Sequence, residues 1–254
     1  MNGTIDAYWL EQTEADVPAG DQWLNARERS RLAGLRFDKR RADWRLGRWT
    51  AKCAVASCLN LPADFHSLVD IEIRAAPSGV PEVFLFNQRA TISLSLSHRA
   101  GQALCAVGLS GASLGCDLEL VESRDHSFVT DFFTSNEQKL VEQAPTGERP
   151  LLVTLLWSAK ESALKTLHLG LRLDTTSVEV KPTHAAPHWE KGSHQHGCID
   201  WSRLFVRCTG DQILYGWWRS ANDMVRTVVS DLSSMTICEL ERGSKRPCKV
   251  SQAS

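Results

Sequence analysis

The chain has 254 residues, 43% hydrophobic and 23% charged, enough for one large domain or two modest ones whose core needs no disulfide. Its formal net charge of −1 gives no reason to expect nucleic acid or an anionic membrane as a partner. No CxxC pair, membrane-length apolar stretch or secretory leader is evident, so we expect a cytoplasmic protein with reduced thiols.

The N-terminal part of the chain predicts a mixture of helices and strands. Helices are expected over residues 18–35 and 40–59, the second because apolar residues recur at three- and four-residue spacing. Residues 110–112 have the length of a hairpin connection between two of the expected strands. These strands span residues 5–10, 71–74, 83–86, 92–96, 103–109 and 113–120.

The C-terminal part repeats this mixture. Thr134 and Glu137 have capping-box spacing before a short helix at 138–143, and a long apolar face predicts a helix over 151–169. Further strands are expected at 177–180, 204–208, 213–218 and 225–230. The segment 183–197 contains four histidines at spacings that match no fixed ligand geometry, so we interpret it as a polar loop. The polar residues from 241 onward are expected to fray.

Two features suggest an internal duplication. Trp49-Thr50-Ala51-Lys52 and Trp157-Ser158-Ala159-Lys160 share one pattern on the two strongest predicted helices. Strands and helices also follow in the same order in both halves. We therefore expect an α+β fold made of a pseudo-twofold pair of similar halves with a ligand cleft between them. The expected boundaries are 1–110 and 111–238, followed by a flexible tail at 239–254.

Residues 27–52 concentrate positive charge in this nearly neutral chain. Ten arginines and lysines face only three acidic residues there. One interpretation is a solvated helix face, and the other is a local site for an anion.

Carboxylates form the most distinctive pattern. Asp117 and Glu119 are two residues apart in an expected strand, so both side chains lie on one face. Glu161 follows on the long helix, next to Lys160 and four residues before Lys165. Three carboxylates with ammonium groups suit Mg²⁺ bridging to a phosphate. The alternatives are an acidic solvent face for the strand and an ordinary i,i+4 surface pair for the helix.

Ser97 and His98 end an alternating strand just before a turn, where they could donate hydrogen bonds to a phosphate oxygen. The chain has no G-x-S-x-G, P-loop, GxGxxG or HExxH motif. A hydrolase triad, P-loop hydrolysis of nucleotides and Rossmann redox chemistry therefore have no basis in the sequence.

Taken in order, these segments resemble the Sfp type of 4′-phosphopantetheinyl transferase over roughly residues 36–171. The family shows a basic helix, a G-K-P turn, a strand ending in S-H, a G-x-D-x-E strand, an F-F-x-x-x-E segment and a W-x-x-K-E-x-x-x-K helix. The corresponding segments here are 45–48, 79–81, 97–98, 115–119, 132–137 and 157–165. The chain departs from the pattern at Val80, which replaces the lysine of G-K-P.

The resemblance implies a monomeric pseudodimer that transfers the phosphopantetheine arm of coenzyme A to a serine of an apo acyl or peptidyl carrier protein, releasing adenosine 3′,5′-bisphosphate. It implies Mg²⁺ ligation by Asp117, Glu119 and Glu161, with Glu161 also a candidate base and Lys165 a catalytic, phosphate-holding residue. The further implied coenzyme A contacts are Arg45, Arg48, Ser97, His98 and Lys160. Two alternatives stay open: a non-catalytic carrier-protein or nucleotide-binding module of this fold, and an unrelated Mg²⁺-dependent phosphohydrolase.

Overall fold

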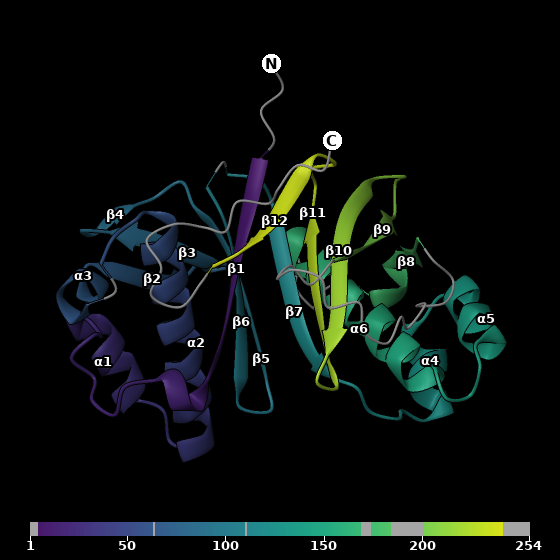
Figure 1. Cartoon of the computed structure of the whole chain (residues 1–254), viewed down its shortest axis with the longest axis horizontal. Coiled ribbons are helices and arrows are strands. Elements are labelled where there is room, and N and C mark those ends of the chain that lie inside the picture. Colours follow the sequence, from purple (N-terminus) through teal and green to yellow (C-terminus); the bar gives the residue numbers. More distant parts are fainter. Residues whose placement is uncertain (1–4, 63, 110, 169–173, 184–200, 241–254) are drawn as a thin grey trace, which may run out of the picture.

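The computed structural model describes residues 5–62, 64–109, 111–168, 174–183 and 201–240. The fold is α+β, and two similar halves stand side by side with their sheets adjacent at the centre (Figure 1). Among the described residues, no helix combines the length and the apolar character that crossing a membrane requires.

The N-terminal half contains two sheets and three α-helices. A four-stranded sheet has the order β12-β1-β6-β5, and a three-stranded sheet has the order β2-β3-β4. The strands are β1 (Ile5–Thr13), β2 (Ile71–Ala75), β3 (Pro81–Leu85), β4 (Gln88–Arg89), β5 (Ser93–Arg99), β6 (Gln102–Gly108) and β12 (Met235–Glu239). The helices are the 3-10 turn η1 (Glu14–Asp16), α1 (Ala26–Ala33), α2 (Asp38–Cys58) and α3 (Phe65–Val69).

The C-terminal half is built on a five-stranded sheet of order β7-β11-β10-β9-β8. Its strands are β7 (Leu114–Leu120), β8 (Val178–Pro182), β9 (Ser202–Cys208), β10 (Ile213–Ala221) and β11 (Met224–Ser230). Its helices are α4 (His126–Phe132), α5 (Ser135–Gln143), α6 (Arg149–Thr166) and the 3-10 turn η3 (Thr175–Ser177).

Strand pairing in the two halves follows the same scheme. β1 pairs with β6 and β6 with β5 in the first half, as β7 pairs with β11 and β11 with β10 in the second, all antiparallel. The β2–β3 pair likewise corresponds to the β8–β9 pair. This correspondence supports the pseudo-twofold arrangement that the sequence predicts.

A buried ion pair is repeated at the W-[S/T]-A-K segments. In the first half, Lys52 pairs with Glu28 at 2.5 Å and donates to two backbone carbonyls. In the second half, Lys160 pairs with Glu137 at 2.8 Å and also donates to two carbonyls. Both glutamates close capping boxes, on α1 and α5 respectively, and both accept the backbone N–H of a strand residue. The shared lysine therefore joins the main helix of each half to a smaller helix and a strand.

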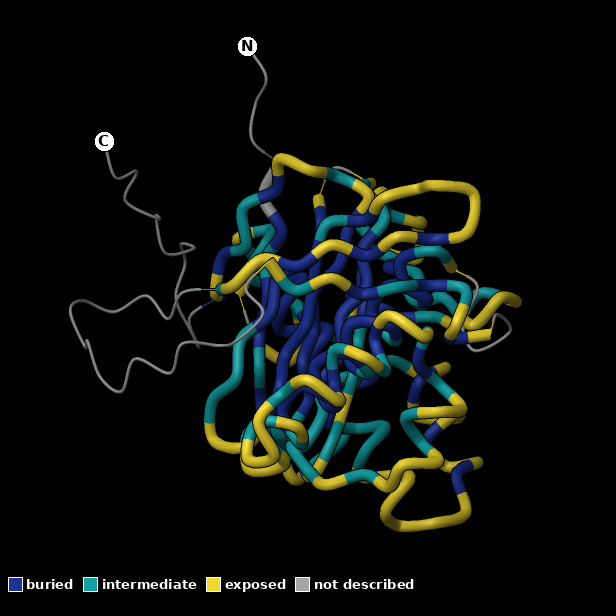
Figure 2. The backbone as a smooth tube through the Cα atoms, turned by 90° about the vertical axis from the view of Figure 1, so that its right-hand side faces the viewer, coloured by how far each residue is buried: buried dark blue, intermediate teal, exposed yellow. Residues whose placement is uncertain are grey.

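Apolar side chains fill the space between the two sheets. Leu114, Cys116 and Leu118 of β7 pack with Trp9 of β1 and Trp217 of β10 in one buried cluster. The central strands are accordingly the most buried part of the chain, and exposed residues gather in peripheral loops and helix ends (Figure 2). This cluster fixes β7 between the halves, which decides where its carboxylates lie.

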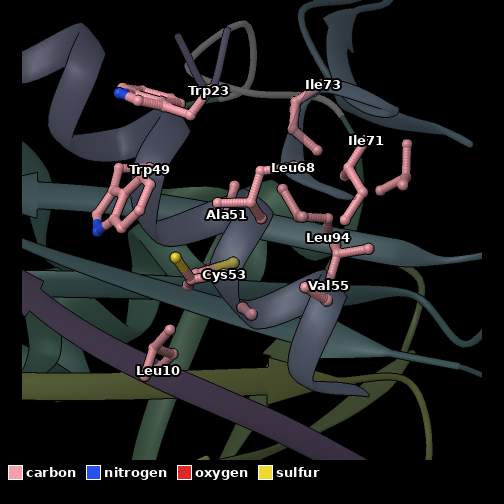
Figure 3. Close-up of a cluster of buried hydrophobic side chains, with 14 of the residues drawn as sticks. Leu10, Trp23, Trp49, Ala51, Cys53, Val55, Leu68, Ile71, Ile73 and Leu94 are labelled. Carbon is pink, nitrogen blue, oxygen red and sulfur yellow. The ribbon is translucent and has the colours of Figure 1, made fainter. Parts of the chain in front are cut away.

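Each half also has a core of its own. In the N-terminal half, α2 packs on the sheet and is buried on all sides from Trp49 to Ala56. Trp49, Ala51, Cys53 and Val55 belong to one cluster with Leu10 and Leu94 (Figure 3). Trp23 meets Trp49 edge to face, with ring centroids 5.2 Å apart. In the C-terminal half, α6 is buried along nearly its whole length because it lies on β7 and β11.

Three expectations differ from the structure. The predicted helix at 18–35 begins only at Ala26, because Asn25 and Glu28 form a capping box that fixes its start. The strands at 103–109 and 113–120 are not a hairpin, since β6 pairs with β1 and β5 whereas β7 pairs with β11. Strand β12 was not predicted, and it pairs in parallel with β1.

The predicted segment 183–197 and the tail from 241 lie outside the described residues except for Thr183. The boundaries at 110 and 238 stay a prediction.

Candidate functional site

The carboxylate strand and the lysine helix meet at a glycine. A Cβ atom at Gly115 would lie 2.0 Å from the Ser162 carbonyl oxygen of α6, so only glycine allows this approach of backbone to backbone. Ser158 and Ser162 of α6 hydrogen-bond to Thr227 of β11, with oxygen–oxygen distances of 2.9 and 2.7 Å. The helix is therefore held against β7 and β11 at a fixed distance.

Asp117 is the hub of the polar contacts. It is only 4% exposed, and its Oδ1 atom accepts hydrogen bonds from Lys165 Nζ and from Ser97 Oγ, each at 2.8 Å. Lys165 Nζ also donates to the Cys116 carbonyl at 2.9 Å. Burial lowers the pKa of Lys165, but the nearby Asp117, Cys116 and Glu161 together outweigh it and the net pKa is raised, so the ammonium form persists. Strand β7, helix α6 and strand β5 thus converge on one carboxylate.

Glu119 lies further along the same strand, near two arginines. Its Oε2 atom is 3.5 Å from Arg99 Nε and 3.7 Å from Arg124 Nη2. Burial raises the pKa of Glu119, and the neighbouring Asp117 raises it further, whereas the two arginines lower it. Glu119 is therefore a carboxylate whose negative charge is only partly compensated.

Glu161 faces this pair from α6 as a half-buried side chain. Burial raises its pKa first, Asp117 and Glu119 raise it as well, and Lys165 lowers it. Glu161 therefore lies within the electrostatic field of Asp117 and Glu119.

Two carboxylate oxygens of this cluster are available as ligands for a cation. Asp117 Oδ2 and Glu119 Oε2 are buried, and neither has a hydrogen-bond partner among the described residues. Within the same described part, no three His, Cys, Asp or Glu side chains are close enough to hold a metal ion by themselves. The donor set thus fits a hard ion such as Mg²⁺, which takes one or two carboxylates from a protein and its other oxygens from water and substrate phosphates.

A cavity of about 420 Å³ opens beside Lys165. Arg48 of α2 and Lys165 of α6 both line it, so cations from the two halves share one space. The Nε atom of Arg48 is buried without a hydrogen-bond partner in the described residues, which leaves a donor for an anion. Val80 and Pro81 contribute an apolar wall.

A second cavity, of about 530 Å³, adjoins the first. Both are lined by Ser78, Val80, Pro81, Leu94, Leu114 and His168. The second also reaches Arg89, which is paired with Glu82 at 2.8 Å. Arg74, another arginine of this half, is not among the residues that line either cavity. It pairs with Glu72 at 2.7 Å and lies over the Phe84 ring. Together the two cavities could accommodate an elongated ligand at the junction of the halves.

The remaining predicted residues lie in different surroundings. Arg45 donates to the carbonyls of residues 18–20 and pairs with Asp21 at 3.0 Å, so a loop occupies its guanidinium. His98 is exposed, and its Nε2 atom is 3.9 Å from Asp43. Lys160 is fully buried in its pair with Glu137, so its position indicates a structural role. The basic stretch 27–52 thus divides into exposed, loop-bound, buried and cavity-lining residues.

Sequence reasoning missed three residues near these cavities and carboxylates. Arg99 and Arg124 partly neutralise Glu119, and Arg124 also lies over the Phe128 ring at 4.5 Å. His168 lines both cavities. His168 could have been found because it lies one turn beyond Lys165, but nothing in the sequence distinguishes the two arginines from other surface arginines.

Comparison with protein-family models finds a match in the second half of the chain. Residues 113–211 match the family model of the 4′-phosphopantetheinyl transferase superfamily, which covers β7, α4–α6 and the strands that follow as far as β9. The matched part of the chain carries Asp117, Glu119, Glu161 and Lys165, and it is similar to that superfamily. No curated protein matches the chain.

Proposed function

We propose that this chain is a Mg²⁺-dependent phosphopantetheinyl transferase of the Sfp type that modifies a serine of an apo acyl or peptidyl carrier protein. The premise is the superfamily match at residues 113–211, which points to phosphopantetheine transfer in general. The observation that carries the proposal is that two buried oxygens, Asp117 Oδ2 and Glu119 Oε2, accept no hydrogen bond among the described residues. They lie near Lys165, which lines a cavity of about 420 Å³.

In this proposal, coenzyme A occupies the cavity with its pyrophosphate toward Lys165 and Arg48. The serine oxygen of the carrier attacks the phosphorus that bears the pantetheine arm, and a new P–O bond forms. The P–O bond to adenosine 3′,5′-bisphosphate breaks, and that product leaves with the electron pair. Holding the two substrates in line supplies much of the acceleration.

Asp117 and Glu119, with Glu161 facing them, are the residues that would hold Mg²⁺. When bound, the ion would neutralise charge on the pyrophosphate. Lys165 holds Asp117 in place through its ammonium group and is one of the residues that line the cavity. Glu161 is the candidate acceptor of the serine proton, because its raised pKa makes it a better base than an exposed glutamate.

The deciding experiment is an incubation with coenzyme A, Mg²⁺ and an apo carrier protein, followed by mass spectrometry of the carrier. We expect a gain of one phosphopantetheine arm, which chelation of Mg²⁺ or the substitution Asp117→Ala prevents. Parallel incubations with carriers from fatty acid, polyketide and peptide synthesis identify the preferred partner.

Two other results would contradict the proposal. Cleavage of coenzyme A without a carrier would favour a phosphohydrolase. Binding of coenzyme A or of the carrier, with neither cleavage nor transfer, would favour a non-catalytic module. Monomeric state and cytoplasmic location remain predictions, which light scattering and cell fractionation would test.

A further inference from the structure

His168 occupies the boundary between the two cavities. It lies one turn after Lys165, just beyond the end of α6, and this exposed residue lines both cavities. Arg48 and Lys165 line the first cavity only. A ligand whose phosphates lie at these two cations would therefore extend past His168 when it enters the second cavity.

The backbone at position 168 has a left-handed conformation, but this conformation does not require a histidine side chain. The φ angle of His168 is 57°, and its N–H donates to the Lys165 carbonyl at 3.1 Å. The corresponding residue after α2 is Asn60, with φ 55° and an N–H that donates to Ser57 at 3.1 Å. Helix termination explains the turn in both halves, and asparagine is a usual residue for it. The imidazole ring of His168 is therefore not explained by the backbone.

Its surroundings favour contact with a flat ring. The wall shared by the two cavities includes Val80, Pro81, Leu94 and Leu114, which are apolar. Arg89, the cation of the second cavity, is already paired with Glu82. Phosphate groups are thus favoured at Arg48 and Lys165, whereas a nucleobase suits the apolar wall and the ring, because histidine is among the side chains on which bases stack.

We propose that His168 is a specificity-determining residue that stacks on the adenine base of coenzyme A. This inference rests on the proposed function, since it names the part of the cofactor that the boundary between the cavities recognises.

The test is a calorimetric titration of His168→Gly with adenosine 3′,5′-bisphosphate, pyrophosphate and 4′-phosphopantetheine. Loss of one base-stacking contact should weaken adenosine 3′,5′-bisphosphate binding by roughly tenfold. Affinity for the two ligands without a base should stay unchanged. His168→Asn, which tolerates the same turn but lacks the ring, should behave like His168→Gly.

Asn60→Gly is the matched control, because it places glycine at the corresponding turn of the other half. It should leave all three affinities unchanged. Melting temperatures of the two glycine variants should be similar, which would separate a binding effect from a folding effect.

Two results would overturn the inference while the proposed function stands. One is an unchanged affinity of His168→Gly for adenosine 3′,5′-bisphosphate in a protein whose wild type transfers the arm. The other is an equal loss for pyrophosphate, which would mean that the ring contacts phosphate. A wild-type protein that neither binds coenzyme A nor transfers its arm would instead refute the proposed function, and the assignment of His168 with it.

Discussion

At the scale of single residues, Arg45 and Arg48 lie one turn apart on α2 and have different surroundings. Arg48 lines the cavity with an unpartnered buried nitrogen, whereas Arg45 is bound to the 18–21 loop. Burial lowers the pKa of the Arg48 guanidinium, as expected for a cation held away from water. The two arginines therefore form a natural pair for separating ligand binding from stability.

We predict that Arg48→Ala weakens coenzyme A binding by the value of one charge-assisted hydrogen bond, about 1.5–3 kcal/mol, with little change in stability. Arg45→Ala should leave coenzyme A affinity unchanged and lower the free energy of unfolding by about 1–2 kcal/mol, because three backbone carbonyls lose their partner. Calorimetric titration and urea denaturation measure the two effects. Weaker coenzyme A binding in Arg45→Ala together with lower stability in Arg48→Ala would contradict the assignment of Arg48 to the cavity.

Substitution of Glu161 should affect the rate of transfer much more than the binding of coenzyme A. Glu161→Gln should lower kcat by roughly 10²–10⁴-fold and change KM for coenzyme A much less, because proton acceptance matters in the transition state. Steady-state kinetics with an apo carrier provides the measurement, and Glu142→Gln on the exposed face of α5 is the control. A Glu161→Gln enzyme with the kcat of the wild type would show that another group accepts the proton.

Cys53 and Cys58 on α2 should be unreactive in the folded protein. Burial raises the pKa of each thiol to about 12, so almost none is thiolate at neutral pH. A thiol whose folded pKa is raised contributes stability below its unfolded pKa of about 8.5 and loses that contribution as pH rises through the folded pKa. We therefore predict that stability declines between pH about 8.5 and about 12.

Alkylation with iodoacetamide at pH 8 checks the reactivity, and urea denaturation at increasing pH checks the stability. The double variant Cys53→Ala, Cys58→Ala should show a shallower alkaline decline. Rapid labelling of either thiol without unfolding would contradict the prediction.

At the scale of elements, the duplicated lysine–glutamate pairs fasten the main helix of each half. Burial lowers the pKa of both Lys52 and Lys160, although their glutamate partners oppose this effect. Each lysine also stabilises backbone carbonyls that have no other described side-chain donor. The same device in both halves indicates that the pairs serve the fold and are not specific to the site.

Removal of one partner from a buried pair leaves an uncompensated charge. Lys160→Met and Lys52→Met should each lower the free energy of unfolding by about 3–5 kcal/mol. Lys181→Met on β8 is an exposed control and should change it by less than about 0.5 kcal/mol. Chemical denaturation measures all three. A small effect at Lys160 together with a lost affinity for coenzyme A would restore this lysine as a cofactor contact.

Elements that rest on local patterns could be predicted from the sequence. The capping-box spacing of Thr134 and Glu137 predicted the start of α5, and the alternation of leucines and serines predicted β5. Elements that depend on distant partners could not. Strand β12 forms because it pairs with the edge of β1, which lies more than 200 residues earlier in the chain. No local sequence pattern reveals this pairing.

The candidate site divides in the same way. Spacing placed Asp117 and Glu119 on one strand face, and the structure joins Asp117 to Ser97 and Lys165 by hydrogen bonds. Neither the loop that binds Arg45 nor the pairing of Lys160 with Glu137 follows from spacing, since both depend on tertiary packing.

At the scale of the whole molecule, the two halves are joined by polar contacts as well as by their shared core. Arg226 of β11 is 3% exposed and binds both carboxylate oxygens of Glu11 on β1, at 2.5 and 2.6 Å. Strand β12 then returns from the second half to pair with β1. The halves are thus bound together by an ion pair and by strand pairing as well as by the apolar cluster.

Arg226→Met should leave Glu11 without its partner and destabilise the protein by about 3 kcal/mol. Unfolding should remain a single transition, because neither half keeps its interface core without the other. Differential scanning calorimetry records both, and Arg207→Met, at an exposed position on β9, is the control. Two separate transitions in the wild type would show that the halves fold independently.

Gly115 determines how closely β7 approaches α6. Because nothing larger than a hydrogen atom fits between β7 and the backbone of α6, Gly115 sets the distance between the strand and the helix that carry the proposed site residues. Asp117 and Glu119 belong to one side of this contact, and Glu161 and Lys165 to the other. A methyl group at position 115 would push β7 away from α6 and so separate Asp117 and Glu119 from Glu161 and Lys165, while all four side chains stay intact. Loss of the proposed activity in such a protein would follow from a shift of β7 relative to α6, because a Cβ atom 2.0 Å from a backbone oxygen forces one of them to move.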